Sequence, residues 1–288
     1  MYGMKVGLLT LCLVVLDARV IDLSHRHGPL TLMSPGQPHY NRSLVSRGEY
    51  LPGVFAENGR YESGEHGGTH MDAPVHFVMD GQTLDDVPIE NTIGEGVMID
   101  CSREASLNNS YMAPLDKVLE WEKQHGEIPP EAAVIFNFGW SWRFNNSRLY
   151  INTESQLLRE MVFPSISEAA GRFLLEQRHV KMIASDTLSP DPLSEGGQNA
   201  RSLPIHQTYL PRGKLIVENL RGTEELPPRG FRFHAAPVRY ADASGAQVRA
   251  YAITYDMSSG AWCCVAHFLC VILCSVVCSG TFSVCPLV

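Results

Sequence analysis

The amino-acid sequence predicts an α/β (α+β) fold, formed as a single domain around a β-rich core. Three observations support this prediction. Five short apolar runs are rich in β-branched residues and have the length of strands. Two longer segments have apolar residues at the three- and four-residue steps of an amphipathic helix. No repeat or low-complexity linker interrupts residues 19–256, which we therefore expect to fold together.

The predicted strands are spread along this whole region. In order, they are RVIDLSH (residues 19–25), GVMIDCS (96–102), AAVIFNFGW (132–140), VKMIASD (180–186) and GKLIVENL (213–220). Several end on a polar or acidic residue, as strands do when they deliver a side chain to a functional site. Glu218 is the clearest example, because it ends a strongly apolar strand in which an unpaired acid would be costly.

Two helices are predicted between these strands. The first, APLDKVLEWEKQHG (113–126), ends at Gly126, a typical helix stop. The second, SISEAAGRFLLEQRH (165–179), has Ser165 as its expected N-cap and Glu168 three residues later as the partner in a capping box. This helix leads directly into the strand that begins at residue 180.

Residues 1–18 have the features of a signal peptide. Lys5 precedes a largely apolar run at residues 6–16, which has the length of a signal-peptide core and is too short to span a bilayer. A buried first strand is the alternative, because the run is rich in Val and Leu. Three N-x-Ser sequons, at Asn41, Asn108 and Asn145, are the expected glycosylation sites. We therefore expect a protein that is secreted or lies in the lumen of the secretory pathway.

Residues 257–288 form an uncharged, Cys-rich hydrophobic tail. From residue 261 onward it contains no Asp, Glu, Lys or Arg, and it is long enough to span a membrane. It is either a membrane contact or an alternative terminus without an evolved role. Six of the eight cysteines lie in this tail, and Cys101 is the only one in residues 19–256. A metal site in the body must therefore use His, Asp and Glu.

A dense group of potential metal ligands lies in HGGTHMDAPVHF, residues 66–77. Its glycines and proline oppose a helix. In an extended chain His70 and Asp72 point to the same side, with Cα atoms about 6.5–7 Å apart. A sharp turn at the two glycines can bring His66 back toward them. Two imidazoles and a carboxylate suit Zn²⁺ or Mn²⁺ and leave coordination positions for water.

His76 lies beyond the proline of this stretch. It is either a further metal ligand or a free imidazole beside the metal-bound water. An imidazole has the right unperturbed pKa to move protons near neutral pH, and we favour this second role.

The pattern H-G-G-T-H-x-D-A-P-x-H-F resembles the signature of the cyclase family, which includes the bacterial metal-dependent kynurenine formamidases and the isatin hydrolases. Similar blocks extend the resemblance over most of the body. They are VIDLSH (20–25), FLLEQRHVKMIASDTLSPD (173–191), LPIHQTYLPRGKLIVENL (203–220) and FHAAPVRYADASGAQVRAYAI (233–253). The fold that this implies is a swivelling β/β/α domain, usually in dimers or higher oligomers.

The resemblance also implies five metal ligands and one residue that donates and accepts protons. The five ligand positions are His66, His70, Asp72, His206 and Glu218. Asp72 and Glu218 would bridge two metal ions, and His76 matches the residue that moves protons. The cofactor implied is one or two Zn²⁺ or Mn²⁺ ions per chain.

The activity that the resemblance implies is hydrolysis of an amide C–N bond in a small aromatic substrate. N-formylkynurenine, the arylformamidase substrate of tryptophan catabolism, is the first candidate, and an isatin-like cyclic amide is the second. Tyr40, Phe77 and Trp140 are candidate aromatic walls for a flat substrate, although each is more simply explained as part of the core. The family commonly has Arg-Thr-Gly-Trp where this chain has Asn-Phe-Gly-Trp, at residues 137–140, and this difference leaves the substrate open.

Two other functions fit the sequence. One is a secreted protein that keeps the fold and the metal without turnover, and the other is a membrane-anchored surface component, suggested only by the tail. The complete set of ligand and proton-transfer residues favours the enzyme. The net charge of −8 argues against a nucleic-acid partner, which would need a basic face. The expected partners are a small aromatic amide and further copies of the chain.

Overall fold

The computed structural model describes residues 16–155, 157–195 and 198–257. Contacts within the chain separate a main unit, Val20–Thr254, from a second unit that contains both chain ends. The expected signal peptide (1–18) and the tail (257–288) therefore lie almost entirely outside the described residues. Among the residues that are described, no helix is both long enough and apolar enough to cross a membrane.

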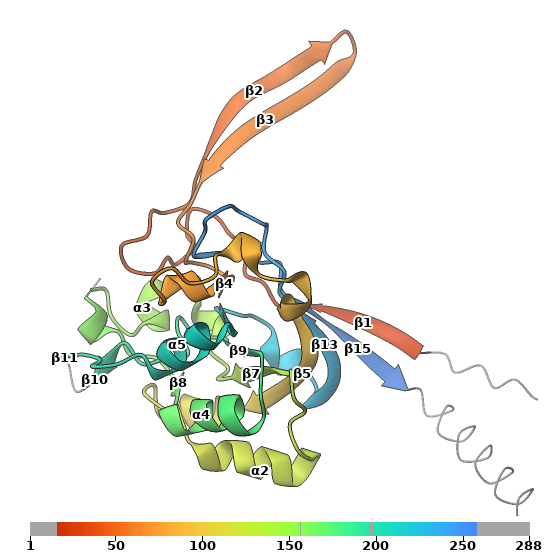
Figure 1. The fold of residues 1–288 in the computed structure, drawn as a ribbon. Coiled ribbons are helices and arrows are strands. Elements are labelled where there is room, and N and C mark those ends of the chain that lie inside the picture. Colours follow the sequence, from red (N-terminus) through yellow and green to blue (C-terminus); the bar gives the residue numbers. More distant parts are fainter. Residues whose placement is uncertain (1–15, 156, 196–197, 258–288) are drawn as a thin grey trace, which may run out of the picture. The chain divides into compact units, whose positions relative to one another are not determined.

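A mixed sheet of nine strands forms the centre of the described structure (Figure 1). Its strand order is β1-β15-β13-β5-β7-β9-β12-β4-β14. The central strands β5, β7, β9 and β12 pair in parallel, whereas β4 and β14 on one side and β13 and β15 on the other pair antiparallel. The strands are β1 (Leu16–Asp22), β4 (His70–Asp72), β5 (Ile93–Asp100), β7 (Ala133–Asn137), β9 (Met182–Ser185), β12 (Leu215–Glu218), β13 (Arg229–His234), β14 (Gly245–Gln247) and β15 (Tyr251–Met257).

Helices and short strand pairs complete the described structure. The α-helices are α1 (Ser102–Leu107), α2 (Leu115–His125), α3 (Ser147–Tyr150), α4 (Glu168–Gln177) and α5 (Pro204–Tyr209). The paired strands outside the large sheet are β2 (Asn41–Leu51) with β3 (Val54–Glu62), β6 (Met112–Ala113) with β8 (Ser165–Ile166), and β10 (Ser194–Glu195) with β11 (Gln198–Asn199). Single 3₁₀ turns include Pro74–His76, which directly follows β4.

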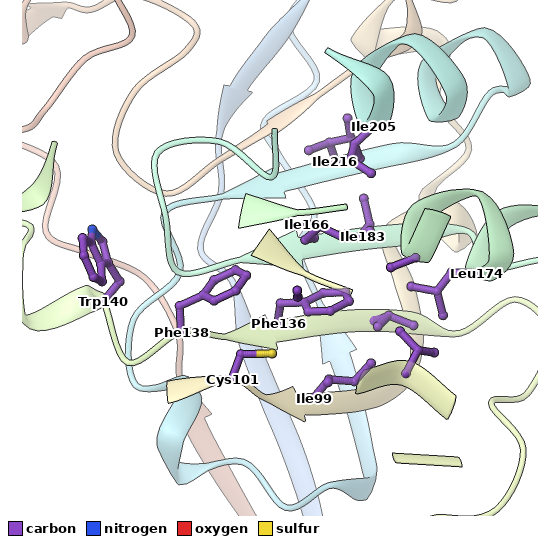
Figure 2. Packing of buried hydrophobic residues seen from close by; sticks show 14 of the residues in the cluster. Ile99, Cys101, Phe136, Phe138, Trp140, Ile166, Leu174, Ile183, Ile205 and Ile216 are labelled. Atoms are coloured by element: carbon purple, nitrogen blue, oxygen red, sulfur yellow. The ribbon is translucent and has the colours of Figure 1, made fainter. Parts of the chain in front are cut away.

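The parallel strands β7, β9 and β12 are buried along their whole length, and their side chains alternate between two hydrophobic layers. On one face, Phe136 and Ile183 belong to the same cluster as Leu174 of α4, and Figure 2 shows their side chains gathered there. On the other face, Ile135 packs in a second cluster with Phe233 of β13. Helices and a large sheet thus build the α/β fold that the sequence predicts.

All five predicted strands are present, as β1, β5, β7, β9 and β12. Both predicted helices are present as α2 and α4, and Gly126 follows α2 with a φ of 88°. The predicted cap of α4 is wrong. Ser167, not Ser165, is the N-cap, and its side chain accepts the N–H of Ala170. Ser165 pairs with Met112 in the β6–β8 ladder, so the chain stays extended until Ser167.

The long hairpin β2–β3 is an element that the sequence analysis missed. Its turn contains Pro52 and Gly53, and Gly53 has a φ of 75°, so a turn signal was present. Nearly all side chains on both strands are exposed, and neither strand therefore shows the alternation of a half-buried strand. Figure 1 shows this hairpin extending away from the large sheet.

Asp186 stabilises the loop that follows β7. Its carboxylate is fully buried and accepts backbone N–H groups from Phe138 at 2.8 Å, Trp140 at 2.6 Å and Ser141 at 3.3 Å. We predict that Asp186→Ala destabilises the protein by about 3 kcal/mol, because each buried N–H left unpaired costs roughly 1–3 kcal/mol. Urea unfolding of the variant measures this. Asp186→Asn, which keeps one acceptor oxygen, should lose less, and an unchanged unfolding midpoint in Asp186→Ala would contradict the assignment.

Candidate metal centre

The candidate ligands meet around β4, which lies between β12 and β14 in the large sheet. His70 of β4 is paired in register with Glu218, the last residue of β12. Asp72 lies two residues beyond His70 on the same strand, so both side chains point to the same face. Gly68, with a φ of 61°, turns the chain before β4 and allows His66 to reach Asp72.

The potential ligand atoms form two groups that share Asp72. Within each group the nitrogen and oxygen atoms lie within 4.8 Å of one another. The groups are His66, Asp72 and His76, and His70, Asp72 and Glu218. His206 of α5 joins both, because its Nε2 lies 3.3 Å from Asp72 Oδ2 and 3.4 Å from Glu218 Oε1. The structure therefore brings together the five ligands that the resemblance implies, with His76 beside them.

Burial and missing partners fit this cluster to a divalent cation. The five ligand side chains are between 1% and 5% exposed: His66, His70, Asp72, His206 and Glu218. Nε2 of His70 and Oδ2 of Asp72 are buried and have no hydrogen-bond partner. An unpaired buried carboxylate oxygen is costly unless a cation lies beside it. The donor set of imidazole nitrogens and carboxylate oxygens suits zinc or manganese.

The pKa shifts of the clustered side chains also indicate that the cluster favours a bound cation. Burial would raise the pKa of the Asp72 carboxyl, but the three surrounding imidazoles hold it well below its usual range. Burial lowers the pKa of His70, yet the carboxylates of Asp72 and Glu218 raise it to about 9 overall. The pKa of Glu218 is raised by burial and by the charge of Asp72. Two carboxylates this close repel each other, and a bound cation would relieve that repulsion.

Contacts outside the cluster orient two of the histidines. Nδ1 of His70 donates to the Gly68 carbonyl oxygen at 2.9 Å, and Nδ1 of His206 lies 2.7 Å from Asp191 Oδ2. Each histidine therefore directs Nε2 toward the carboxylates. Asp191 also accepts the backbone N–H groups of Ile205 and His206 at the start of α5. The sequence gives no signal that Asp191 supports the cluster; in the structure its carboxylate is completely buried, and these contacts supply the partners that a buried carboxylate needs.

His76 lies on the 3₁₀ turn beyond Pro74, half-buried against the cluster. Its ring stacks on that of His66, with centroids 3.8 Å apart and an interplanar angle of 19°. Burial lowers the pKa of His76 to about 4; the charge of Asp72 opposes this effect, and the neighbouring histidines His66, His206 and His70 add to it. The imidazole is thus favoured in its neutral form, which can accept a proton or ligate a metal. The position of His76 is consistent with both roles that the sequence suggested, a further metal ligand or a free imidazole that moves protons.

Phe77 is the one candidate aromatic side chain that the structure places against the cluster. Its ring centroid lies 4.7 Å from that of His206, and it is 38% exposed. Tyr40 contacts His27 instead, with centroids 5.2 Å apart. Trp140 is 1% exposed and belongs to the hydrophobic core (Figure 2). Its indole N–H donates to the backbone carbonyl of Tyr150. A core role therefore explains Trp140 fully.

The α/β fold and the buried cluster of His, Asp and Glu side chains define a protein with a candidate metal-binding site. Comparison with known sequences assigns the chain to a family. The chain belongs to the cyclase family: the family model described as "Putative cyclase" matches residues 21–192. The resemblance to the cyclase family, which was based on the HGGTHMDAPVHF motif, is therefore confirmed.

Relatives of this chain include hydrolases. Isatin hydrolase of Roseibium aggregatum is 27% identical over 195 residues, which cover 66% of this chain and 72% of the relative. Kynurenine formamidase of Salinibacter ruber is 24% identical over 235 residues, which cover 80% of this chain and 95% of the relative. Isatin hydrolase A from Ralstonia solanacearum has a solved structure with a TM-score of 0.72 at 26% identity, covering 82% of this chain and 92% of that one. The similarity includes the fold as well as the sequence.

Proposed function

We propose that this protein is a metal-dependent hydrolase that cleaves an amide C–N bond in a small aromatic substrate. The observation that carries the proposal is the buried cluster around Asp72, with unpaired ligand atoms on His70 and Asp72, in a chain of the cyclase family. The relatives named above, isatin hydrolase and kynurenine formamidase, are hydrolases. N-formylkynurenine is the first candidate substrate, and its conversion to kynurenine is the arylformamidase reaction of tryptophan catabolism.

The metal site would hold one or two zinc or manganese ions. Its ligands would be His66, His70, Asp72, His206 and Glu218. A divalent ion bound there supplies Lewis-acid chemistry and lowers the pKa of water. The carboxylates of Asp72 and Glu218 balance the positive charge, and Asp191 keeps the His206 ring in place.

His76 would move the proton that amide hydrolysis requires. Its neutral imidazole can accept a proton from the water molecule that attacks the carbonyl carbon. It can then donate this proton to the leaving nitrogen when the C–N bond breaks. Phe77 follows His76 directly and is partly exposed beside His206, where it can cover a flat aromatic ring. These two residues would thus place the scissile bond between the metal cluster and the surface.

An isatin-type cyclic amide is the second candidate substrate. The observation that favours it is the similarity to isatin hydrolase A from Labrenzia aggregata, whose solved structure has a TM-score of 0.74 at 26% identity. In both candidates the nitrogen of the scissile amide bond is attached directly to an aromatic ring. The difference at residues 137–140 does not separate them, because Asn137 and Phe138 are buried in the structure.

An assay of both substrates on the metal-loaded protein tests this proposal. A higher kcat/KM for N-formylkynurenine than for isatin is the expected result. The opposite order would make the protein an isatin hydrolase-type enzyme. Tight metal binding without hydrolysis of either compound or of a wider amide set would favour the alternative of a binding protein without turnover.

The expected secretory location is a separate proposal. Asn41, Asn108 and Asn145 are all exposed, as glycosylated asparagines must be, although Asn41 lies at the start of strand β2 rather than in a loop. We expect cleavage of the signal peptide at residues 1–18 and glycan on at least one of the three sites. A mass that glycosidase does not change, with Met1 still present, would refute this.

A homo-oligomer is also proposed, with the hairpin β2–β3 as the surface most suited to a second copy. A two-stranded hairpin alone is marginally stable in water, and this one exposes large apolar side chains. They are Leu44, Val45, Tyr50, Leu51, Val54, Phe55 and Tyr61. Light scattering should give a dimer or larger species, and a monomer would refute this. Detergent partitioning with and without residues 257–288 tests the proposed membrane contact of the tail.

A further inference from the structure

His66 meets the cluster through a different ring nitrogen from its neighbours. His70 and His206 use Nδ1 for contacts outside the cluster and direct Nε2 toward the carboxylates. In His66 the ring is reversed. Its Nδ1 lies 2.8 Å from Asp72 Oδ1, and its Nε2 lies 2.9 Å from the hydroxyl oxygen of Ser244. To offer a lone pair to a metal ion, His66 therefore needs the opposite tautomer from the other two histidines.

Ser244 is in turn fixed by Glu65. The backbone N–H of Ser244 donates to Glu65 Oε2 at 3.0 Å, and the Ser244 hydroxyl donates to the same oxygen. An ionised carboxylate can only accept hydrogen bonds, so the hydroxyl proton points to Glu65. The hydroxyl oxygen then has only lone pairs for His66. Nε2 of His66 therefore carries a proton and donates it to Ser244, and in the neutral ring Nδ1 keeps the lone pair that a metal requires.

We propose that Glu65 and Ser244 are positioning residues that set His66 in the tautomer whose Nδ1 ligates the metal. This inference rests on the part of the proposed function that assigns metal binding to the cluster. Partners of this kind orient the ligand and raise its basicity, and their loss typically costs about 10–100-fold in metal affinity. The Ser244 hydroxyl contacts the cluster at His66 and Glu65 contacts that hydroxyl, so we expect their effect to reach the metal through His66.

The hydrogen-bonded series Glu65–Ser244–His66 can be tested by mutation at its exposed end, Glu65. His66 is 3% exposed, and a Cβ atom added at Gly245 would lie 2.6 Å from its Cε1, so the ring is closely packed on that side. Glu65 has a side chain that is 45% exposed and lines a surface hollow of about 460 Å³ beside Tyr61 and Tyr240. A substitution at Glu65 therefore tests the hydrogen-bonded series Glu65–Ser244–His66 without creating a cavity in the hydrophobic core.

Zinc affinity of the metal-free protein, measured by competition with a chromophoric chelator, tests the proposal without substrate. Ser244→Ala should bind Zn²⁺ about 10–100-fold more weakly than the original protein. Ser244→Thr keeps the hydroxyl and should restore most of the affinity. Glu65→Gln removes the carboxylate charge that orients the hydroxyl and should also weaken binding. Glu62→Gln removes the same charge from the same hollow and should have no effect.

Histidine ¹⁵N NMR of the zinc-loaded protein supplies a readout that a structural role alone would not change. The expected spectrum has His66 bound through Nδ1 with a proton on Nε2, and His70 and His206 with the reverse pattern. Coordination of His66 through Nε2 would overturn the proposal, as would unchanged affinity in Ser244→Ala and Glu65→Gln. If Ser244→Ala does not fold, Glu65→Gln decides. An original protein that binds no zinc refutes the metal site itself and thereby the proposed function.

Discussion

Replacing His70 with alanine is expected to abolish metal binding and activity together. His70 lies on β4 at the centre of the cluster, 1% exposed, with Nε2 3.4 Å from both Asp72 and Glu218. Its removal deletes a candidate ligand and one of the two imidazoles, with that of His206, that lie beside both carboxylates. The loss of metal affinity should exceed the roughly 10–100-fold that changes to outer partners cause. Metal content by mass spectrometry and kcat on the same sample measure both effects.

His39→Ala is the matched control for this prediction, because it removes an exposed imidazole that belongs to neither ligand group. It should keep both metal and activity. A His70→Ala protein that is folded, metal-loaded and active would show that the cluster around β4 is not the metal site.

Replacing His76 with alanine is expected to separate chemistry from metal binding. If His76 moves the proton, its removal should leave metal content near normal and lower kcat by about 10²- to 10⁴-fold, the usual contribution of a general acid–base group. The turn at Pro74 places His76 outside β4, against the ring of His66 rather than on the strand that carries His70 and Asp72.

The alternative role for His76 predicts a different result. Its ring nitrogen lies within 4.8 Å of ligand atoms of His66 and Asp72, so the geometry also permits coordination. A His76→Ala protein that loses its metal as His70→Ala does would make His76 a ligand, and the acid–base role would be wrong. Measuring metal and kcat on both variants side by side separates the two.

The sequence was sufficient for those parts of the fold that local patterns determine. The strands β7, β9 and β12 are continuous apolar runs because both faces are buried, and α2 and α4 have helical periodicity because one face packs on the sheet. The hairpin β2–β3 was missed because exposure of both faces removes the pattern. The cap of α4 was misplaced because pairing of β8 with β6, remote in sequence, kept Ser165 extended.

The residues of the candidate site also divide into those that the sequence predicts and those that only the folded chain reveals. The spacing of His66, His70 and Asp72 was informative because all three lie within seven residues of one turn and strand. His206 could be assigned only through the family resemblance, since nothing in its neighbours marks it as a ligand. Asp191 and Ser244 could not be assigned at all. Their contacts with ligands span 15 and 178 residues of sequence, and only the folded chain shows them.

Bound metal in the purified protein, measured together with activity before and after chelation, tests the central claim most directly. We expect one or two equivalents of a divalent transition metal per chain, loss of amide hydrolysis on chelation, and recovery when Zn²⁺ or Mn²⁺ is added back. Chelation should also lower the melting temperature, because a ligand that binds only the folded state stabilises it. Full hydrolytic activity in a protein shown to contain no metal would contradict a metal-dependent hydrolase.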